Sequence, residues 1–95
     1  MPEGINLDSR VRILDDVLFQ ELQGEAVLLN LNTGVYFGLD AIGTRIWRLL
    51  QEDGALHTVL EAMLREFDVA PEELTRDLLD LVCQMRQARL LAAAE

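Results

Sequence analysis

The chain has 95 residues, 51% of them hydrophobic and 26% charged, a composition that is typical of one folded domain and excludes a disordered chain. Its 17 acidic and 8 basic side chains give a formal net charge of −9. A field of this sign repels the phosphate backbone of nucleic acids and favours basic peptide partners.

The N-terminal half is predicted to form a three-stranded antiparallel sheet. Strands are expected over residues 17–22, 26–31 and 35–37, which are runs of alternating or continuous apolar side chains, and residues 10–13 are expected to be extended. The second of these strands is apolar at nearly every position, so we expect both of its faces to be covered. Turn residues separate the strands, with Gln23-Gly24-Glu25 in the first turn and Asn32-Thr33-Gly34 in the second.

The residues of the third strand are expected to differ in how they pack. Val35 and Phe37 alternate with Tyr36 and are predicted to pack in the core. Tyr36 has a polar tip and is as well suited to packing as to a binding edge. Gly38 permits a bend or a close approach of another backbone.

The C-terminal half is predicted to form three helices. Asp40 is the expected N-cap of the first helix, and Asp53-Gly54 ends it. The third helix is expected to begin with Pro71. The side chains expected to face the core are Ile42, Ile46, Leu49 and Leu50 in the first helix, Leu56, Val59, Leu60, Met63, Leu64 and Phe67 in the second, and Leu74, Leu78, Leu81, Val82 and Met85 in the third. Trp47 lies beside the first set and is expected in the core or at its rim.

The third helix also carries a second strip that a core does not require. Leu79, Cys83 and Arg86 recur at i, i+4 and i+7, displaced from the main apolar face. The helix is expected to end at Arg89, and the short tail after it is expected to fold back.

The ends of the chain complete the predicted domain. Residues 1–9 are polar and expected to be flexible, although Ile5 and Leu7 are apolar enough to dock on the sheet. Three strands followed by three helices predict a single α+β domain over residues 1–95, in an arrangement that resembles a winged helix-turn-helix.

We expect a cytoplasmic protein, because one cysteine forms no internal disulfide, no apolar run approaches the roughly 20 residues that span a bilayer, and the first residues lack the features of a secretory signal.

The sequence holds no pattern typical of an enzyme. His57 is the single histidine and is expected to be exposed, and no acid–histidine–nucleophile set can be built around it. Cys83 is expected to be a buried or half-buried structural thiol. Neighbouring acids such as Glu72-Glu73 are expected to be solvated or to stabilise the positive end of a helix. Since metal-ligand spacings and nucleotide-binding motifs are also absent from the sequence, we expect no catalysis, cofactor or metal.

One long run of the sequence resembles a known family. The run LLNLNTGVYFGLDAIGTRIWRLL, a following Asp-Gly turn, an amphipathic helix ending in Phe67-Asp68 and a third helix with an acidic start resemble the PqqD-like proteins, which recognise peptides in pathways of ribosomally made, post-translationally modified peptides. Tyr36-Phe37-Gly38-Leu39, Gly43 and Ile46-Trp47 are most similar to the stand-alone recognition proteins of lasso peptide clusters. The resemblance covers about residues 10–91. Two departures are Gly54-Ala55 and Ala70, which lack capping side chains and weaken their helix starts by on the order of 1 kcal/mol.

The resemblance implies a binding function and a site. It implies that the leader of a precursor peptide adds as an antiparallel strand to the free edge of the third strand and lies against the third helix. Leu79, Val82 and Cys83 are then expected to form an apolar floor, while charged residues of the helix pair with polar leader residues. The complete set of expected peptide-binding residues is Val35, Tyr36, Phe37, Gly38, Arg76, Leu79, Asp80, Val82, Cys83 and Arg86. The implied role is non-enzymatic: the protein delivers its peptide to a leader peptidase or another maturation enzyme.

Two other functions remain open from the sequence. A winged helix is able to bind DNA, but the acidic third helix and the net charge of −9 oppose that function. A structural or oligomerisation module is able to dimerise through the same strand edge. A salt titration tests the first alternative, and the size in solution with and without a peptide tests the second.

Overall fold

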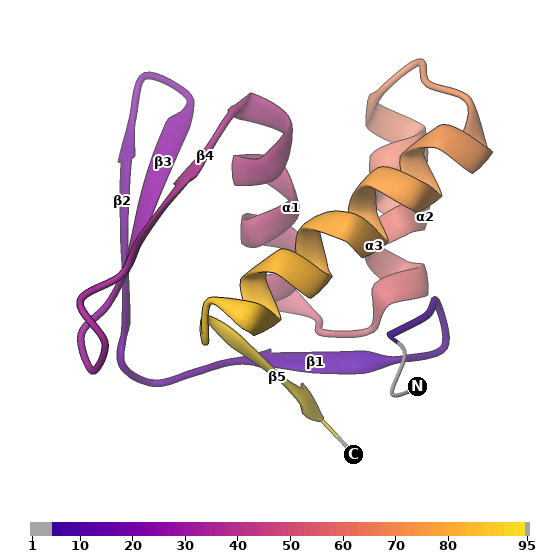
Figure 1. Cartoon of the computed structure of the whole chain (residues 1–95). Helices are drawn as coiled ribbons and strands as arrows, with labels where there is room; N and C mark the ends of the chain where they lie inside the picture. The colour runs from indigo at the N-terminus through magenta and orange to yellow at the C-terminus, as the bar shows by residue number, and fades with distance from the viewer. Residues whose placement is uncertain (1–4, 95) are drawn as a thin grey trace.

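The structure is a computed structural model that describes residues 5–94. Three helices follow four short strands, and a fifth strand follows the helices (Figure 1). The elements are β1 (Arg10–Ile13), β2 (Val17–Leu22), β3 (Glu25–Asn30), β4 (Tyr36–Leu39), α1 (Ala41–Glu52), α2 (Leu56–Glu66), α3 (Pro71–Gln87) and β5 (Leu91–Ala94). An α+β chain with a three-stranded antiparallel sheet and three helices is therefore confirmed, whereas its likeness to a winged helix-turn-helix stays a prediction.

The three-stranded sheet has the order β2-β3-β4, as predicted, with antiparallel pairing throughout. Its inner face is buried through Ala26, Leu28 and Asn30 of β3. The prediction that both faces of this strand are covered is wrong, because Val27 is 43% exposed on the outer face and Leu31 beyond the strand end is 55% exposed. The reason is that all three helices lie on one side of the sheet (Figure 1).

A second, two-stranded sheet joins the two ends of the described chain. β5 pairs with β1 in antiparallel register from Arg10↔Ala94 to Ile13↔Leu91. Leu90 and Leu91 are buried, so the expected folding back of the tail is confirmed, although its strand was not predicted. At the start of the chain, Ile5 and Leu7 pack partly buried against the core. The predicted flexibility of residues 1–4 lies outside the described residues.

The first helix packs its predicted face with one exception. The amide of Gly43 donates a hydrogen bond of 2.8 Å to Oδ1 of Asp40, which confirms this residue as the N-cap. Trp47 is buried in the core, as are Ile46, Leu49 and Leu50. The prediction that Ile42 faces the core is wrong: its side chain is exposed, because the first turn of α1 lies at an open edge of the sheet.

Backbone contacts from the N-terminal segment take the place of the missing cap on α2. Ala55 makes no side-chain capping bond, but the amide of Leu56 donates to the carbonyl oxygen of Ser9 at 3.2 Å. The amide of Val11 donates to the carbonyl oxygen of Gly54 at 3.0 Å. A Cβ atom on Gly54 would lie 1.9 Å from the carbonyl oxygen of Val11, so only glycine fits at this crossing.

The remaining apolar residues complete the core between the sheet and the helices. In α2, Leu56, Val59, Leu60 and Met63 are buried, and Leu64 and Phe67 pack partly buried against them. In α3, Leu74, Leu78, Val82 and Met85 are buried and Leu81 is half-buried. The prediction of a core position for Val35 is wrong, because this residue belongs to the turn that precedes β4 and its side chain is 44% exposed. Phe37 packs partly buried against the core, in line with its prediction.

Candidate functional site

The strand β4 forms one edge of the three-stranded sheet, as expected for the end of a meander. The amide of Asn30 donates to the carbonyl oxygen of Val35 at 3.0 Å, so this is a hydrogen-bonded pair of the β3–β4 ladder. Bonded and non-bonded pairs alternate along an antiparallel ladder. The backbone groups of Phe37 and Leu39 therefore point to β3, whereas those of Tyr36 and Gly38 point to the free edge.

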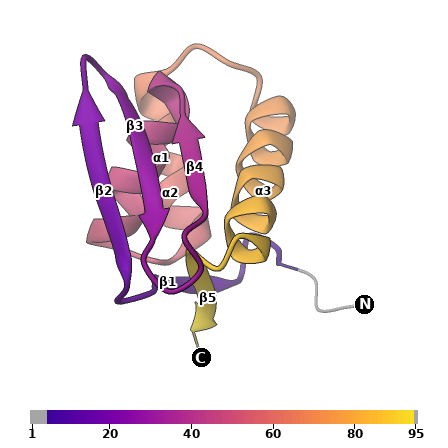
Figure 2. The same cartoon turned by 60° about the vertical axis from the view of Figure 1, so that its left-hand side comes forward.

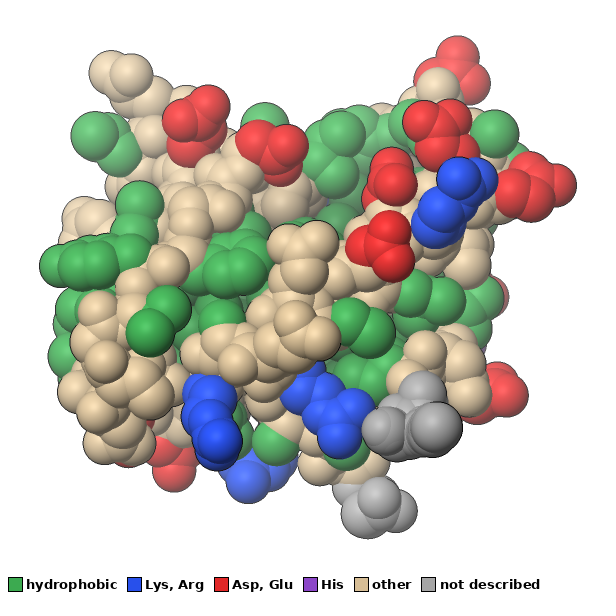
Figure 3. Space-filling model, viewed as in Figure 1, with side chains coloured by type: hydrophobic (Ala, Val, Ile, Leu, Met, Phe, Trp, Pro, Cys, Tyr) green, Lys and Arg blue, Asp and Glu red, His purple; other side chains and the backbone are tan. Residues whose placement is uncertain are grey.

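A groove runs between this edge and α3. Figure 2 shows how the strand β4 and the helix α3 lie next to each other. The volume of the groove is about 490 Å³. Residues 37–40 form one wall, Asp77, Leu81 and Gln84 of α3 form the other, and Ile42 and Ile46 of α1 lie at its base. In the space-filling view, hydrophobic side chains lie between the three-stranded sheet and α3 (Figure 3). The groove therefore offers an apolar base beside unpaired backbone groups, which is what an added strand requires.

The polar groups of the groove are mostly acidic. Asp40 and Asp77 line it, and neither takes part in an ion pair among residues 5–94. Figure 3 shows further acidic side chains over the N-terminal part of α3, where Glu72, Glu73 and Asp80 are exposed. This wall favours cationic or hydrogen-bond-donating side chains in a bound molecule.

The ion pairs of the described residues lie elsewhere on the surface. Arg48 pairs with Glu21, and Arg45 pairs with Glu66 through two hydrogen bonds of 2.6 and 2.7 Å. The hydrogen bond from Arg45 lowers the pKa of Glu66 below its ordinary value. The amide of Ala55 likewise lowers the pKa of Asp53, with a smaller contribution from Arg10. These exposed pairs join neighbouring elements and leave the groove free.

Helix α3 presents two strips with the same spacing, and the groove uses the one that the sequence did not favour. Residues 77, 81 and 84 face β4, whereas Leu79, Cys83 and Arg86 share a different flank of the helix and do not line the groove. The sequence favoured the second strip because it is more apolar, while Leu81 was assigned to the core. The signal in the sequence that could have identified the groove strip is the spacing of Leu81 with the polar residues Asp77 and Gln84, at i, i+4 and i+7.

The other expected site residues are placed as follows. Phe37 and Gly38 line the groove, and Val35 and Tyr36 are exposed near its end. Val82 is completely buried, so the prediction that it floors an open groove is wrong. Cys83 is exposed, so the prediction of a buried or half-buried thiol is also wrong. Arg76 and Asp80 are exposed on α3, and like Leu79, Cys83 and Arg86 they remain predicted peptide contacts.

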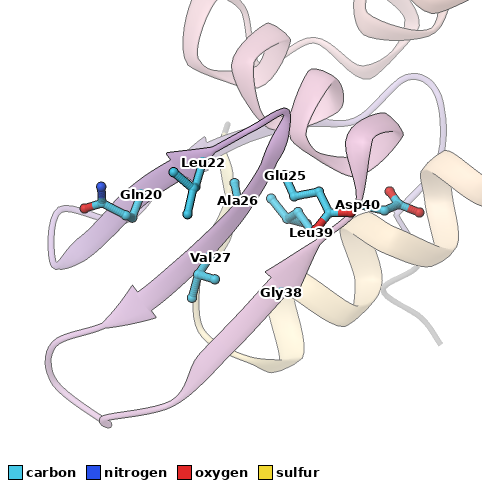
Figure 4. A pocket seen from close by; sticks show the side chains of 8 residues that line it. All are labelled: Gln20, Leu22, Glu25, Ala26, Val27, Gly38, Leu39 and Asp40. Atoms are coloured by element: carbon cyan, nitrogen blue, oxygen red, sulfur yellow. The ribbon is translucent and has the colours of Figure 1, made fainter.

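A second pocket lies on the outer face of the sheet (Figure 4). It has a volume of about 540 Å³ and is lined by Gln20, Leu22, Glu25, Ala26, Val27, Gly38, Leu39 and Asp40. This pocket was not predicted, because the apolar run of β3 was interpreted as buried on both sides. The outer pocket and the groove share residues 38–40. The outer pocket lies on the side of the sheet where Leu22 and Val27 are exposed, and the groove lies on the side of α1 and α3.

Residues 5–94 contain no group of three or more His, Cys, Asp or Glu side chains placed to hold a metal ion. His57 is exposed on α2, as predicted. The described helices include none that is long and apolar enough to cross a membrane.

Comparisons with known proteins point to one family. The family model described as coenzyme PQQ synthesis protein D (PqqD) matches residues 25–91. The chain is also similar to a solved structure described as TbiB1 in complex with the TbiA(beta) leader peptide, with a TM-score of 0.82 and 38% sequence identity over 88% of this chain and 98% of that chain. No curated protein matches the sequence.

Proposed function

The chain belongs to the PqqD family, and on that basis we propose that it binds the leader segment of a ribosomally made precursor peptide as an antiparallel strand added to β4. The observation that carries the proposal is the free edge of β4 beside an apolar groove. The likeness to TbiB1, whose structure contains the TbiA(beta) leader peptide, supports it.

Backbone hydrogen bonds would supply much of the affinity in this mode of binding. Tyr36 and Gly38 direct their amide and carbonyl groups to the free edge, so a peptide strand bonds to both residues. Alternate peptide side chains then enter the groove, where Ile42, Ile46 and Leu81 favour apolar groups. Asp40 and Asp77 favour a donor or a cation next to them.

The proposed biological role is that of an adaptor without catalysis. The protein holds the leader and delivers the precursor to a leader peptidase or another maturation enzyme. The likeness to TbiB1 and the Tyr36-Phe37-Gly38-Leu39 run favour a pathway of the lasso peptide type. Strand addition requires no cofactor, and none is proposed.

Self-association is a second candidate function, favoured by the same free edge and by the exposed outer face of the sheet. DNA binding in the manner of a winged helix is disfavoured, because α3 exposes Glu72, Glu73, Asp77 and Asp80 and the chain carries a net charge of −9.

Fluorescence anisotropy with a labelled leader peptide tests the proposal. The probe is the synthetic leader of the precursor encoded in the same gene cluster, and a scrambled peptide of identical composition is the control. We expect saturable binding of the leader alone and a complex of one chain with one peptide by light scattering. Equal binding of the leader and the scrambled peptide would refute leader recognition. A chain that is dimeric both with and without the leader peptide, and that does not bind this peptide, would favour self-association. Steeply salt-dependent binding of duplex DNA would favour the remaining alternative.

A further inference from the structure

Asn30 closes the turn before β4 with both its backbone and its side chain. It is the last residue of β3 and is almost completely buried. Its backbone amide donates to the carbonyl oxygen of Val35, and its own carbonyl oxygen accepts from the amide of Gly34 at 2.8 Å. Its Oδ1 atom accepts from the amides of Asn32 and Thr33. One residue therefore fixes the segment that leads into the edge strand.

The end of α3 offers a carbonyl group to this side chain. Arg89 has a φ in the left-handed region that favours glycine, and its amide donates to the carbonyl oxygen of Arg86 at 3.0 Å. The amide of Leu90 donates to the carbonyl oxygen of Met85 at 2.9 Å, which completes a Schellman motif at the helix end. This motif does not use the carbonyl oxygen of Arg89, which accepts a hydrogen bond of 2.6 Å from Nδ2 of Asn30.

The bond between Asn30 and Arg89 joins the two sides of the groove. Of residues 5–94, it is the one hydrogen bond between residues 17–39, which hold the three-stranded sheet, and residues 71–94, which hold α3 and β5. Figure 2 shows the turn before β4 beside the end of α3. Along the groove itself, residues 37–40 face the side chains of α3 across open space. Asn30 therefore sets the separation of the two walls at this end.

Resting on the proposed function, we propose that Asn30 is a positioning residue for leader binding, which holds β4 and α3 at the separation that an added strand needs. The peptide has to lie about 4.8 Å from the edge of β4 while its side chains reach Leu81 of α3. A helix that moves away from the turn loses the second contact, and a helix that moves closer leaves no room for the first. A groove fixed before the peptide arrives avoids the cost of ordering its walls on binding. Asn30 itself is buried and acts through the turn and Arg89.

The hydrogen bonds at this position select an asparagine. Two turn amides need an acceptor and the carbonyl oxygen of Arg89 needs a donor, and one side-chain amide supplies both. An ionised aspartate has the same shape but only acceptors, so it would keep the turn bonds and repel the carbonyl oxygen of Arg89. Protonation of that aspartate would restore the donor. This difference separates the role of the bond to Arg89 from the role of the turn.

The variant Asn30→Asp tests the inference through leader affinity. At neutral pH it should bind the cluster-encoded leader at least about tenfold more weakly than the wild-type protein, under conditions in which circular dichroism shows both to be folded. The ratio of the two affinities should return toward one as the pH falls, because the protonated carboxyl group donates again. Measuring the wild-type protein at each pH accounts for the titration of Asp40 and Asp77 in the groove.

Two further variants separate the bond to Arg89 from other bonds of the turn. Asn30→Ser has a hydroxyl group that accepts from the turn amides but is too short to replace the bond to Arg89. It should also weaken leader binding, without recovery at low pH. Asn32→Ala is the matched control, since it removes only the side-chain bond to Asp16 from the same turn, and it should change the affinity by less than about twofold.

Thermodynamic linkage gives a test in the wild-type protein. If the bond between Asn30 and Arg89 favours leader binding, the bound leader must favour this bond to the same extent. The side-chain amide of Asn30, followed by NMR, should then exchange with solvent at least about fivefold more slowly in the leader complex, a larger change than that of the α2 backbone amides, which lie away from the groove. If the wild-type protein binds the leader and this exchange rate is unchanged, or if folded Asn30→Asp binds normally, the inference is overturned while the proposed function stands. If the wild-type protein does not bind the leader, the proposed function itself fails.

Discussion

The side-chain amide of Asn30 donates a hydrogen bond of 2.6 Å to the backbone carbonyl oxygen of Arg89. Its Oδ1 atom accepts hydrogen bonds from the amides of Asn32 and Thr33, at 2.8 and 3.1 Å. Asn30 is 3% exposed, and Arg89 follows the end of α3 with a φ of 62°. This one buried side chain therefore ties the turn before β4 to the end of α3, and so links the strand and the helix that supply the two walls of the groove.

Replacing Asn30 by alanine should lower the free energy of unfolding by about 1–3 kcal/mol, because it removes the three hydrogen bonds that this buried side chain makes with two backbone amides and one carbonyl oxygen. Chemical denaturation measures the effect. Asn32→Ala is the matched control, since the side chain of Asn32 bonds to Asp16 on the exposed surface. Equal losses of unfolding free energy in the two variants would show that the hydrogen bonds of Asn30 contribute no more to stability than the surface bond of Asn32.

The crossing of β1 over the start of α2 gives a second prediction. Gly54→Ala places a Cβ 1.9 Å from the carbonyl oxygen of Val11, so β1 has to move and the bonds from Val11 and Leu56 weaken. We expect a loss of at least about 2 kcal/mol in stability. Gly38→Ala, with open space at its Cβ, should be neutral or slightly stabilising. Thermal melts that rank the two variants in the reverse order would contradict this account of the crossing.

The alternation along β4 separates two proline variants. Tyr36→Pro removes a donor from the free edge and should weaken leader binding by at least about tenfold while the domain stays folded. Phe37→Pro removes a donor that points to β3, so we expect it to destabilise the sheet itself. Circular dichroism melts and leader titrations of both variants check the distinction. Undiminished affinity in a folded Tyr36→Pro protein would be incompatible with strand addition at this edge.

The two strips of α3 make competing predictions about leader contacts. From the groove geometry, Leu81→Asp should weaken leader binding by more than about 1 kcal/mol, because a covered carboxylate loses solvation. The sequence instead predicts that Leu79→Asp and Cys83→Asp do so. We expect Cys83→Asp, at an exposed position on the other flank, to leave both affinity and melting temperature nearly unchanged. Loss of binding in the Cys83 variant with normal affinity in the Leu81 variant would place the leader on the flank that the sequence favoured.

Local chemistry explains which parts of the fold were predictable. Turn residues such as Asn32 and Gly34, the capping residue Asp40 and the apolar periodicity of α2 act within a few neighbouring residues, so the sequence identifies them directly. The strand β5 was missed because Leu91–Ala94 consists mostly of alanine, which has no strand preference, and becomes extended through its pairing with β1.

The candidate site was predictable in its strand and not in its helix. The edge position of β4 follows from the meander, and so do the free backbone groups of this strand. Which flank of α3 faces β4 depends on how the helix rotates when Leu74, Leu78 and Val82 enter the core, and both flanks satisfy the same i, i+4, i+7 spacing. The outer pocket was hidden because exposed Val27 and Leu31 have the same apolar pattern as buried strand residues.

Amide hydrogen exchange along β4, followed by NMR with and without the bound leader peptide, tests strand addition most directly. The amides of Phe37 and Leu39 point to β3 and should be protected in both states. Those of Tyr36 and Gly38 point to the free edge and should exchange at least about tenfold more slowly when the leader is bound. Unchanged exchange at Tyr36 and Gly38 in a saturated complex, or new protection confined to the opposite edge strand β2, would contradict the proposal that the leader adds to β4.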